Sequence, residues 1–331
     1  MINYNFSVED ASRVRLAAFS PIGEIVFSIR TITAPHRDRS HLPWVQAVSP
    51  RLRAVDFRPL FAVIPPTGYI PDFLTPPPRQ EFPDLREELE AVRATAPERM
   101  VEQLGWLDCD ALIPAEWRSR YAPVRRELLA DPSRGAYLLA QLLHDFWQLA
   151  VQPYWPRMRN WLKTYAFQQS QVLANAGNAS YLSNLNDQVR CDNGRVTVAS
   201  DYDYSVDLDG GCLLLWPSVF SGSRVLTMLP PDQPMLIYQS PGVETLWQRA
   251  ALPANPLTSL MGYVRATILE LVASPASTTE LAQLLSVTPG AVSQHLNVLR
   301  ENGLVSSSRR GRSVLYQRTD VGDTLISAAL R

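Results

Sequence analysis

The final 75 residues of the 331-residue chain carry helix-start and turn signals in an order that leaves few possible folds. Ser277 and Glu280 bracket a capping box (STTE), in which the two side chains satisfy backbone amides at the start of a helix. Pro289 suits the first position of the next helix, and Gly303 follows its last turn. A strand start, an arginine-rich tip and a returning strand come next. Residues 257–331 are therefore predicted to form helices joined by a short turn and followed by a β-hairpin.

The helix that begins at Pro289 is predicted to be buried on one narrow face only. Its apolar residues recur at i, i+4 and i+7 spacing, which are Val292, Leu296 and Leu299. The opposite face carries small or amide side chains, which are Gly290, Gln294 and Asn297. The amides of glutamine and asparagine can pair with N6 and N7 of adenine in the major groove of DNA. This exposed face is therefore predicted to contact DNA.

The predicted order of elements is that of a winged helix-turn-helix, with a first helix over about 257–273 and a last helix over about 320–330. In this fold one helix is held at an angle that fits the major groove. We expect Gln294 and Asn297 to read bases, and the groups around them to position the duplex at its phosphates. The predicted DNA-binding residues are Ser277, Thr278, Thr288, Gly290, Ser293, Gln294, His295, Asn297, Arg309, Arg310 and Arg312.

This segment resembles the recognition helix and wing of ArsR-type winged-helix regulators, in the stretches TELAQLLSVTPGAVSQHLNVLRENGLV and RRGRSVLYQRT. The resemblance implies a homodimer, joined largely through the first and last helices, that binds a palindromic operator and represses transcription. It also implies DNA contacts by Ser293, Gln294 and His295. Metal-sensing members carry a cysteine pair at the second helix or Asp/His ligands on the last helix. Here the second helix has no cysteine and the last helix no histidine, so we expect no such metal site.

Residues 1–250 are predicted to form a separate, helix-rich α+β domain. A strand is expected over 2–6, and helices over 8–18, from Pro21 onward, over 42–55 and repeatedly between 84 and 186. After Asn186 the period changes to that of short strands, which predicts an antiparallel β meander. Eight prolines in residues 59–83 predict an extended strap packed on the domain, with a PxxP ligand as the alternative.

Composition places the chain among globular proteins and narrows its location. Hydrophobic residues make up 46% and charged residues 19%, which excludes wholesale disorder. The three cysteines lie far apart, which argues against a disulfide framework and suits a reducing compartment. The sequence shows neither a signal-peptide pattern nor an apolar run of roughly 20 residues that could span a bilayer. We therefore expect a cytoplasmic protein without a membrane partner.

No recognisable catalytic motif occurs in residues 1–250, because a glycine-rich phosphate loop, a nucleophile elbow and an HExxH pair are all missing. We expect no catalytic residue, metal or cofactor. This region resembles a large uncharacterised domain found ahead of such winged helices in bacterial regulators, and we expect it to sense a small, non-metal effector. An enzyme with an appended DNA-binding module is the alternative, and a winged helix that binds protein is another. Aromatic residues that could be core or could line an effector pocket are Trp147, Tyr154, Trp155 and Trp161.

Overall fold

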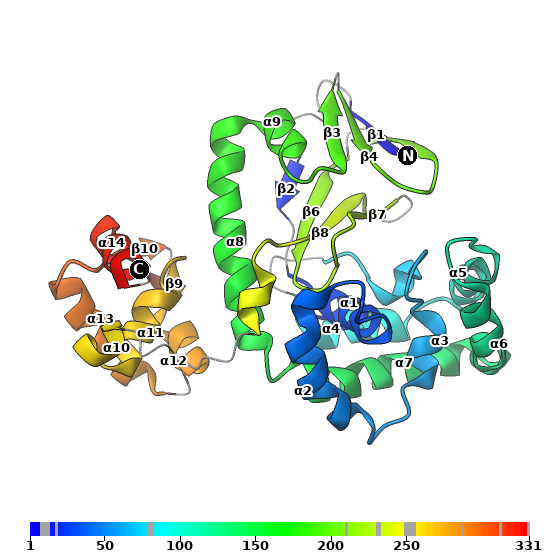
Figure 1. The fold of residues 1–331 in the computed structure, drawn as a ribbon, viewed down its shortest axis with the longest axis horizontal. Coiled ribbons are helices and arrows are strands. Elements are labelled where there is room, and N and C mark those ends of the chain that lie inside the picture. Colours follow the sequence, from blue (N-terminus) through cyan, green and yellow to red (C-terminus); the bar gives the residue numbers. More distant parts are fainter. Residues whose placement is uncertain are drawn as a thin grey trace. The chain divides into compact units, whose positions relative to one another are not determined.

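The structure is a computed structural model that describes residues 1–6, 14–16, 19–78, 83–192, 194–208, 211–229, 233–247, 256–285, 287–310 and 313–329. Contacts divide the chain into two compact units (Figure 1). Unit 1 comprises Met1–Trp155 and Gln168–Trp247, and unit 2 comprises Pro156–Phe167 and Gln248–Arg331. Residues 156–167, expected in the N-terminal domain, group with unit 2, and the domain boundary between residues 250 and 257 stays a prediction. In the described part of the chain, no helix combines the length and the apolar character needed to cross a membrane.

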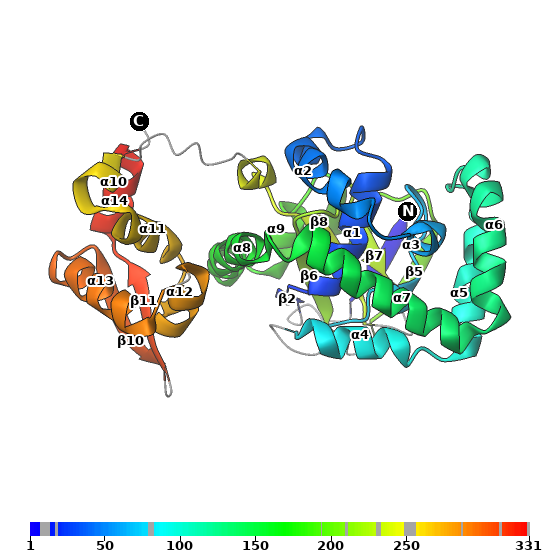
Figure 2. The ribbon, with the colours of Figure 1, turned by 90° about the horizontal axis from the view of Figure 1, so that it is seen from below.

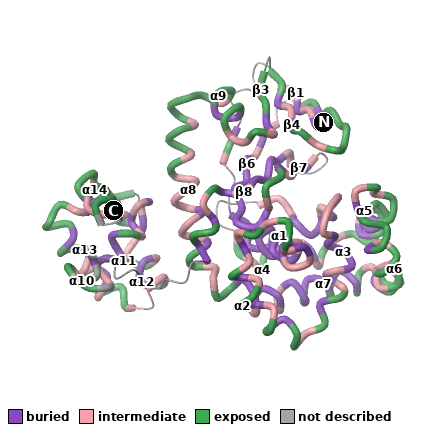
Figure 3. The backbone as a smooth tube through the Cα atoms, in the orientation of Figure 1, coloured by how far each residue is buried: buried purple, intermediate pink, exposed green. Residues whose placement is uncertain are grey.

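Unit 1 is built around α1, whose residues are almost all buried (Figure 3). Ser20 caps this helix by accepting a hydrogen bond from Gly23 N at 3.0 Å, and Pro21 occupies its first position, as predicted. The helix packs against α2, α3, α4 and α7. The helices of unit 1 are α1 (Pro21–Thr33), α2 (Leu42–Leu52), α3 (Arg58–Val63), α4 (Leu85–Arg93), α5 (Pro97–Cys109), α6 (Ala115–Ala130), α7 (Pro132–Phe146) and α9 (Asn178–Ser183). Helix α8 (Trp155–Ala176) is divided, because its residues 156–167 belong to unit 2. Shorter helical turns are η2 (Arg39–His41), η3 (Asp72–Leu74), the π-helical η4 (Trp147–Val151) and η5 (Val243–Leu246).

Two four-stranded sheets accompany these helices, and Figure 2 labels all four strands of one of them, β2, β6, β8 and β7. The first has the order β3-β4-β1-β5 and the second the order β2-β6-β8-β7. Their strands are β1 (Ile2–Asn5), β2 (Val14–Leu16), β3 (Val189–Asp192), β4 (Arg195–Val198), β5 (Tyr204–Asp207), β6 (Leu213–Ser218), β7 (Leu226–Met228) and β8 (Met235–Gln239). Tyr4 on β1 links the sheets, because its hydroxyl donates to Met228 O on β7 at 3.1 Å.

The sheets correct two predictions about the strands. Among the strands after Asn186, the expected antiparallel pairing holds for β3–β4 and β7–β8, but β6–β8 is parallel. The early strands pair with this region as well, β1 antiparallel to β4 and parallel to β5, and β2 parallel to β6. Residues 14–16, expected in a helix over 8–18, form β2 instead because β6 supplies their backbone partners. The other residues of that predicted helix, 8–13 and 17–18, lie outside the described residues.

The proline-rich segment is only partly the extended strap that its composition predicts. Arg58–Val63 forms α3, because Pro59 occupies the first turn, where its missing N–H is not needed. Beyond α3 the chain runs mostly without helix as far as residue 78, and it is packed on the unit through buried side chains such as Phe73 and Leu74. Arg30 on α1 holds this strap by donating from Nε to Pro65 O at 2.9 Å and from Nη2 to Gly68 O.

Two buried carboxyl groups hold the N-terminal end of α1 in place. Glu24 accepts backbone hydrogen bonds from Val219 N and Phe220 N, which follow β6. Glu88 on α4 accepts from Ile22 N at 3.0 Å, in the first turn of α1. Burial raises the pKa of Glu24 to about 7 and that of Glu88 to about 7, and this effect outweighs the hydrogen bonds that stabilise their charged forms.

These raised pKa values predict that the chain loses stability as pH rises from about 4.5 to about 7. In that interval the folded state binds more protons than the unfolded state, so the free energy of unfolding falls, by about 1 kcal/mol per pH unit for each carboxyl. Denaturant unfolding of the full chain at pH 5, 6 and 7 measures the slope. The variants Glu24→Gln and Glu88→Gln should each flatten it, and a slope unchanged in both variants would contradict the assignment.

Candidate nucleic-acid interface

Unit 2 has the elements of a winged helix-turn-helix in their expected order. They are α10 (Pro256–Met261), α11 (Tyr263–Leu271), β9 (Ala276–Ser277), α12 (Thr278–Leu285), α13 (Pro289–Glu301), β10 (Val305–Arg310), β11 (Ser313–Arg318) and α14 (Asp320–Ala329). The single first helix predicted over 257–273 is corrected to two helices. Gly262 separates them with φ +83°, a backbone conformation that interrupts an α-helix and that glycine adopts without strain.

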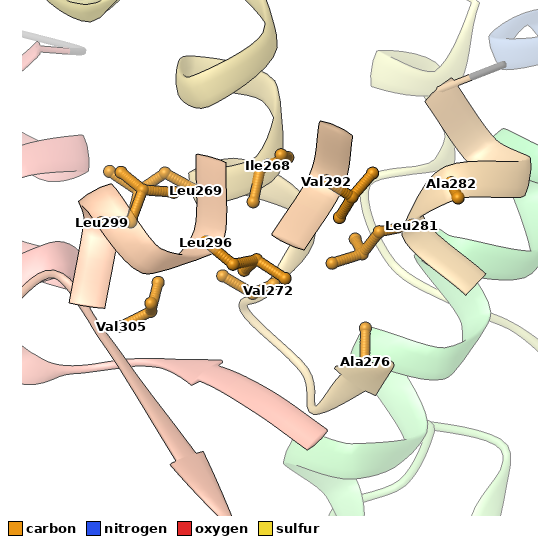
Figure 4. Packing of buried hydrophobic residues seen from close by; sticks show 10 residues of the cluster. All are labelled: Ile268, Leu269, Val272, Ala276, Leu281, Ala282, Val292, Leu296, Leu299 and Val305. Carbon is orange, nitrogen blue, oxygen red and sulfur yellow. The ribbon is translucent and has the colours of Figure 1, made fainter. Parts of the chain in front are cut away.

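The predicted apolar stripe of α13 is buried and forms the centre of this unit. Figure 4 shows Val292, Leu296 and Leu299 among side chains from the neighbouring helices and from β10. Their partners in the cluster include Ile268, Leu269, Val272, Leu281 and Val305. Because these contacts come from α11, α12 and the wing, they fix the rotation of α13 about its own axis.

The opposite face of α13 is open, as the sequence predicted. Gly290, Gln294 and Asn297 are exposed, and Ser293 and His295 beside them are partly buried. The Oδ1 of Asn297 accepts a hydrogen bond at 3.1 Å from Nη2 of Arg300, an exposed residue absent from the predicted set. Its i+3 spacing from Asn297 was the available signal, since residues three apart on a helix are neighbours.

Three predicted contact residues lie at helix starts. Thr288 is exposed and caps α13, because its Oγ1 accepts from Ala291 N at 3.3 Å. Ser277 forms the predicted capping box with Glu280: its Oγ accepts from Glu280 N at 3.3 Å, and Ser277 N donates to Glu280 Oε2 at 2.9 Å. Thr278, the first residue of α12, is partly buried. The hydroxyl of Ser277 is thus engaged in holding α12.

The capping carboxylate of Glu280 is also paired with a lysine of α8, within residues 156–167 of unit 2. Lys163 Nζ donates to Glu280 Oε1 at 2.9 Å. Partial burial acts to raise the pKa of Glu280, but hydrogen bonds from Ser277 and Lys163 outweigh it, so the pKa lies below its usual value. Glu280 is therefore charged at neutral pH and stabilises the start of α12.

The wing presents arginines on an exposed strand. β10 and β11 pair antiparallel with Arg309 opposite Val314 and Arg310 opposite Ser313. Arg309 and Arg310 are exposed, and neither forms an ion pair with the residues that the structure describes. Arg312, the third predicted wing contact, lies outside the described residues. At the base of the hairpin, Arg318 donates to Asp323 on α14 and to Leu269 O on α11, which ties the wing to two helices.

Three of the four aromatic residues proposed for an effector site pack against other aromatic rings. Trp147 and Trp155 have ring centroids 5.3 Å apart, and Tyr154 lies 5.9 Å from Trp247. Trp147 is buried and Trp161 partly buried. A ligand role for these four residues remains a prediction. No group of three or more histidine, cysteine or acidic side chains suited to a metal ion occurs within the described ranges.

Comparisons with known proteins concern the same part of the chain. Residues 264–307 match the family model described as bacterial regulatory protein, arsR family. The chain is 40% identical over 74 residues to the HTH-type transcriptional regulator NmtR of Mycobacterium tuberculosis, which is 22% of this chain and 62% of that protein. The chain thus spans about three fifths of the length of this curated relative.

Solved structures with similarity to this chain cover the same fraction of it. The transcriptional regulator BldR from Sulfolobus solfataricus is 29% identical with a TM-score of 0.21, over 23% of this chain and 59% of that chain. Reduced HlyU from Vibrio cholerae is 27% identical with a TM-score of 0.20, over 23% of this chain and 81% of that chain. The family match shows that residues 264–307 are an arsR-family helix-turn-helix domain, which the wing extends.

Two glycines of this domain are predicted to respond oppositely to alanine. A Cβ at Gly290 would meet nothing within 4 Å, whereas a Cβ at Gly322 on α14 would overlap Leu304 O. Gly290→Ala should therefore leave the domain as stable or stabilise it by up to about 1 kcal/mol. Gly322→Ala should destabilise it by about 1–3 kcal/mol. Thermal unfolding of the two variants measures both, and a large loss of stability in Gly290→Ala would show that α13 is not open at its start.

Proposed function

We propose that this protein is a sequence-specific, DNA-binding transcriptional regulator. The proposal rests on the exposed face of α13 that bears Gln294 and Asn297. The buried apolar stripe on the opposite side of the helix keeps this face directed outward. Arg309 and Arg310 on β10 of the same domain are also exposed, and arginine side chains are suited to contacts with DNA phosphates. The arsR-family match, and a relative that is itself described as a transcriptional regulator, support the same class.

We further propose that the regulator is a homodimer that binds a palindromic operator in the cytoplasm and represses transcription. Two large apolar residues on contacting helices are left open to solvent: Leu260 on α10 is 73% exposed and Val321 on α14 is 61% exposed. An exposed apolar surface on these helices suits a second copy of the chain. A two-fold dimer would in turn match two half-sites of a palindrome.

Unit 1 is proposed to be a regulatory domain that senses a non-metal effector, rather than an enzyme. This assignment rests on its linkage to an arsR-family domain and on the missing catalytic motifs of its sequence. Effector binding would change DNA affinity by a coupling free energy, which is typically about 1–3 kcal/mol.

The DNA-binding face is tested by two variants with different expected signatures. Gln294→Ala should weaken operator binding by about 1–3 kcal/mol and relax preference at one base step, because it removes an amide that reads a base. Arg310→Ala should weaken binding to all sequences alike and lower the salt slope by about one, because it removes a phosphate contact. The operator is first selected from random DNA. Fluorescence anisotropy titrations at several salt concentrations then measure the loss of affinity and the change in salt slope.

Matched controls for these variants come from unit 1. Gln46→Ala removes an exposed glutamine on α2, and Arg86→Ala removes an exposed arginine on α4. Both should bind the operator as the wild type does. If Gln294→Ala and Arg310→Ala also bound operator and scrambled duplex like the wild type, the proposed face would be wrong.

The proposed dimer is tested by placing a charge on the exposed apolar residues of α10 and α14. Leu260→Glu and Val321→Glu should each give a monomer in sedimentation velocity, because an unpaired carboxylate would be buried at the interface. Operator affinity should fall by about tenfold or more, since one half-site is lost. Val101→Glu is the control, because Val101 on α5 is 48% exposed in unit 1. A wild-type monomer, or dimers of unchanged mass in both variants, would refute this interface.

A further inference from the structure

Unit 1 contains a cavity of about 1140 Å³ whose lining comes entirely from that unit. Its walls are the C-terminal half of α1, the strap after α3, helix α5, the loop before β5 and the segment from Phe220 into β7. The volume of about 1140 Å³ slightly exceeds the range typical of small-molecule sites, about 300–1,000 Å³. It is therefore large enough to enclose a small organic molecule.

The lining offers hydrogen-bond donors without partners. Gln103 on α5 is 5% exposed; its Oε1 accepts from Phe73 N at 2.9 Å, and no described residue accepts from its NH2 group. Ser221 is 8% exposed, and its Oγ has no hydrogen-bond partner. Buried polar groups are nearly always hydrogen-bonded, so the unpaired Ser221 hydroxyl favours a ligand that supplies an acceptor, and the NH2 group of Gln103 is a second donor available to it.

Arg30 in the same lining has no direct ion pair with the described residues; the charge of Asp110 acts on it from nearby, but Asp110 Oδ2 already accepts from Tyr69 N at 2.7 Å. Arg30 donates to the carbonyls of Pro65 and Gly68. Burial, with the charge of nearby Arg37 as a smaller cause, lowers the pKa of Arg30 to about 10, so its guanidinium remains charged at neutral pH. Arg37 also lines the cavity and has no ion-pair partner among the described residues. An anion bound here would offset the cost of a partly buried positive charge.

The acidic residues of the lining do not supply that anion. Asp38 is paired with His41, and Asp72 accepts from the Tyr69 hydroxyl at 2.9 Å. Asp201 is paired with Arg224. The remaining acidic residues of the lining are all exposed to solvent, namely Glu98, Glu102 and Asp203. The buried part of the lining therefore has hydrogen-bond donors without partners, whereas its carboxylate acceptors already have partners.

Apolar and aromatic side chains make up much of the remaining lining. The buried ones include Phe27, Phe220, Met228 and Ile237, and the more accessible ones include Tyr69 and Trp106. Flat aromatic surfaces favour a ligand with an aromatic body, through stacked or edge-to-face contacts.

We propose that this cavity binds a small aromatic carboxylate, or a closely similar aromatic anion, whose acceptors meet Gln103, Ser221 and Arg30. That such a ligand is the effector of DNA binding rests on the function proposed above. Binding of such a ligand in this cavity does not depend on that proposed function.

The charge preference is tested with three probes that share one ring system: 2-naphthoate, 2-naphthamide and 2-naphthylmethylammonium. Isothermal titration of the full-length chain should give the carboxylate an affinity about tenfold or more above that of the amide, because hydrogen bonds to charged groups are the stronger ones. The cation should bind weakest. Tightest binding of the cation, equal binding of all three probes, or binding of none would overturn the proposal.

The location is tested with substitutions that leave the structural contacts in place. Gln103→Glu keeps an acceptor for Phe73 N but replaces the free donor with a negative charge, so 2-naphthoate binding should fall about tenfold or more. Ser221→Ala should weaken binding by a smaller factor without lowering the melting temperature, because the hydroxyl has no partner to lose. Thermal unfolding of both variants checks that the fold is intact.

A control variant separates this cavity from the aromatic cluster around Trp155. None of Trp147, Tyr154, Trp155 and Trp161 lines the cavity. Trp155→Ala should therefore bind 2-naphthoate as the wild type does. If Trp155→Ala abolished binding while Gln103→Glu had no effect, the ligand site would lie at the aromatic cluster and the proposal would be wrong.

Operator binding in the presence of 2-naphthoate separates the cavity from the proposed function. Release of operator in the wild type but not in Gln103→Glu is the result expected of an effector site. Binding of the probe with unchanged operator affinity would support the cavity and contradict effector sensing through it. Binding of the probe by a chain that binds no DNA would support the cavity and contradict the proposed function.

Discussion

The insertion of one apolar stripe into the core of unit 2 determines where the rest of α13 points. Val292, Leu296 and Leu299 are buried against two helices and the first wing strand, and rotation of α13 would expose them. Fully burying such side chains stabilises a fold by about 1.5–3 kcal/mol each. The polar face is outward because the apolar face is held inward. The geometry suited to a DNA groove is thus a consequence of packing, and it needs no contribution from the polar residues themselves.

In unit 1 the corresponding constraint is the pair of carboxyl groups that hold α1. Glu24 joins the helix to the segment after β6, and Glu88 joins its first turn to α4. Because both carboxyl groups are buried, loss of these hydrogen bonds would leave buried polar groups without partners and would destabilise the unit. Phe220 lines the cavity, so the Glu24 contact joins one wall of the cavity to the first turn of α1.

Local signals explain which parts of the structure could be predicted from sequence. The start of α13 is determined by Thr288 and Pro289 and its orientation by a three-residue stripe, so both can be predicted without tertiary information. The strand β2 could not be predicted, because three residues become a strand only where β6 pairs with them. The break at Gly262 is equally hidden, since a glycine within a helical pattern is usually tolerated. The cavity joins Arg30, Gln103 and Ser221 from distant parts of the sequence, and no local pattern brings them together.

One chain of contacts leads from the cavity to the end of unit 1. Trp247 Nε1 donates to His41 Nδ1 at 2.9 Å, and the other ring nitrogen of His41, Nε2, lies 3.3 Å from Asp38 Oδ2. The hydrogen bond from His41 holds the pKa of Asp38 well below its usual value. Asp38 and Phe220 both line the cavity, and Phe220 stacks on Trp247 with centroids 5.4 Å apart. Phe220 contacts Trp247 directly, whereas Asp38 reaches Trp247 only through His41, so two residues of the cavity lining adjoin the last residue of unit 1.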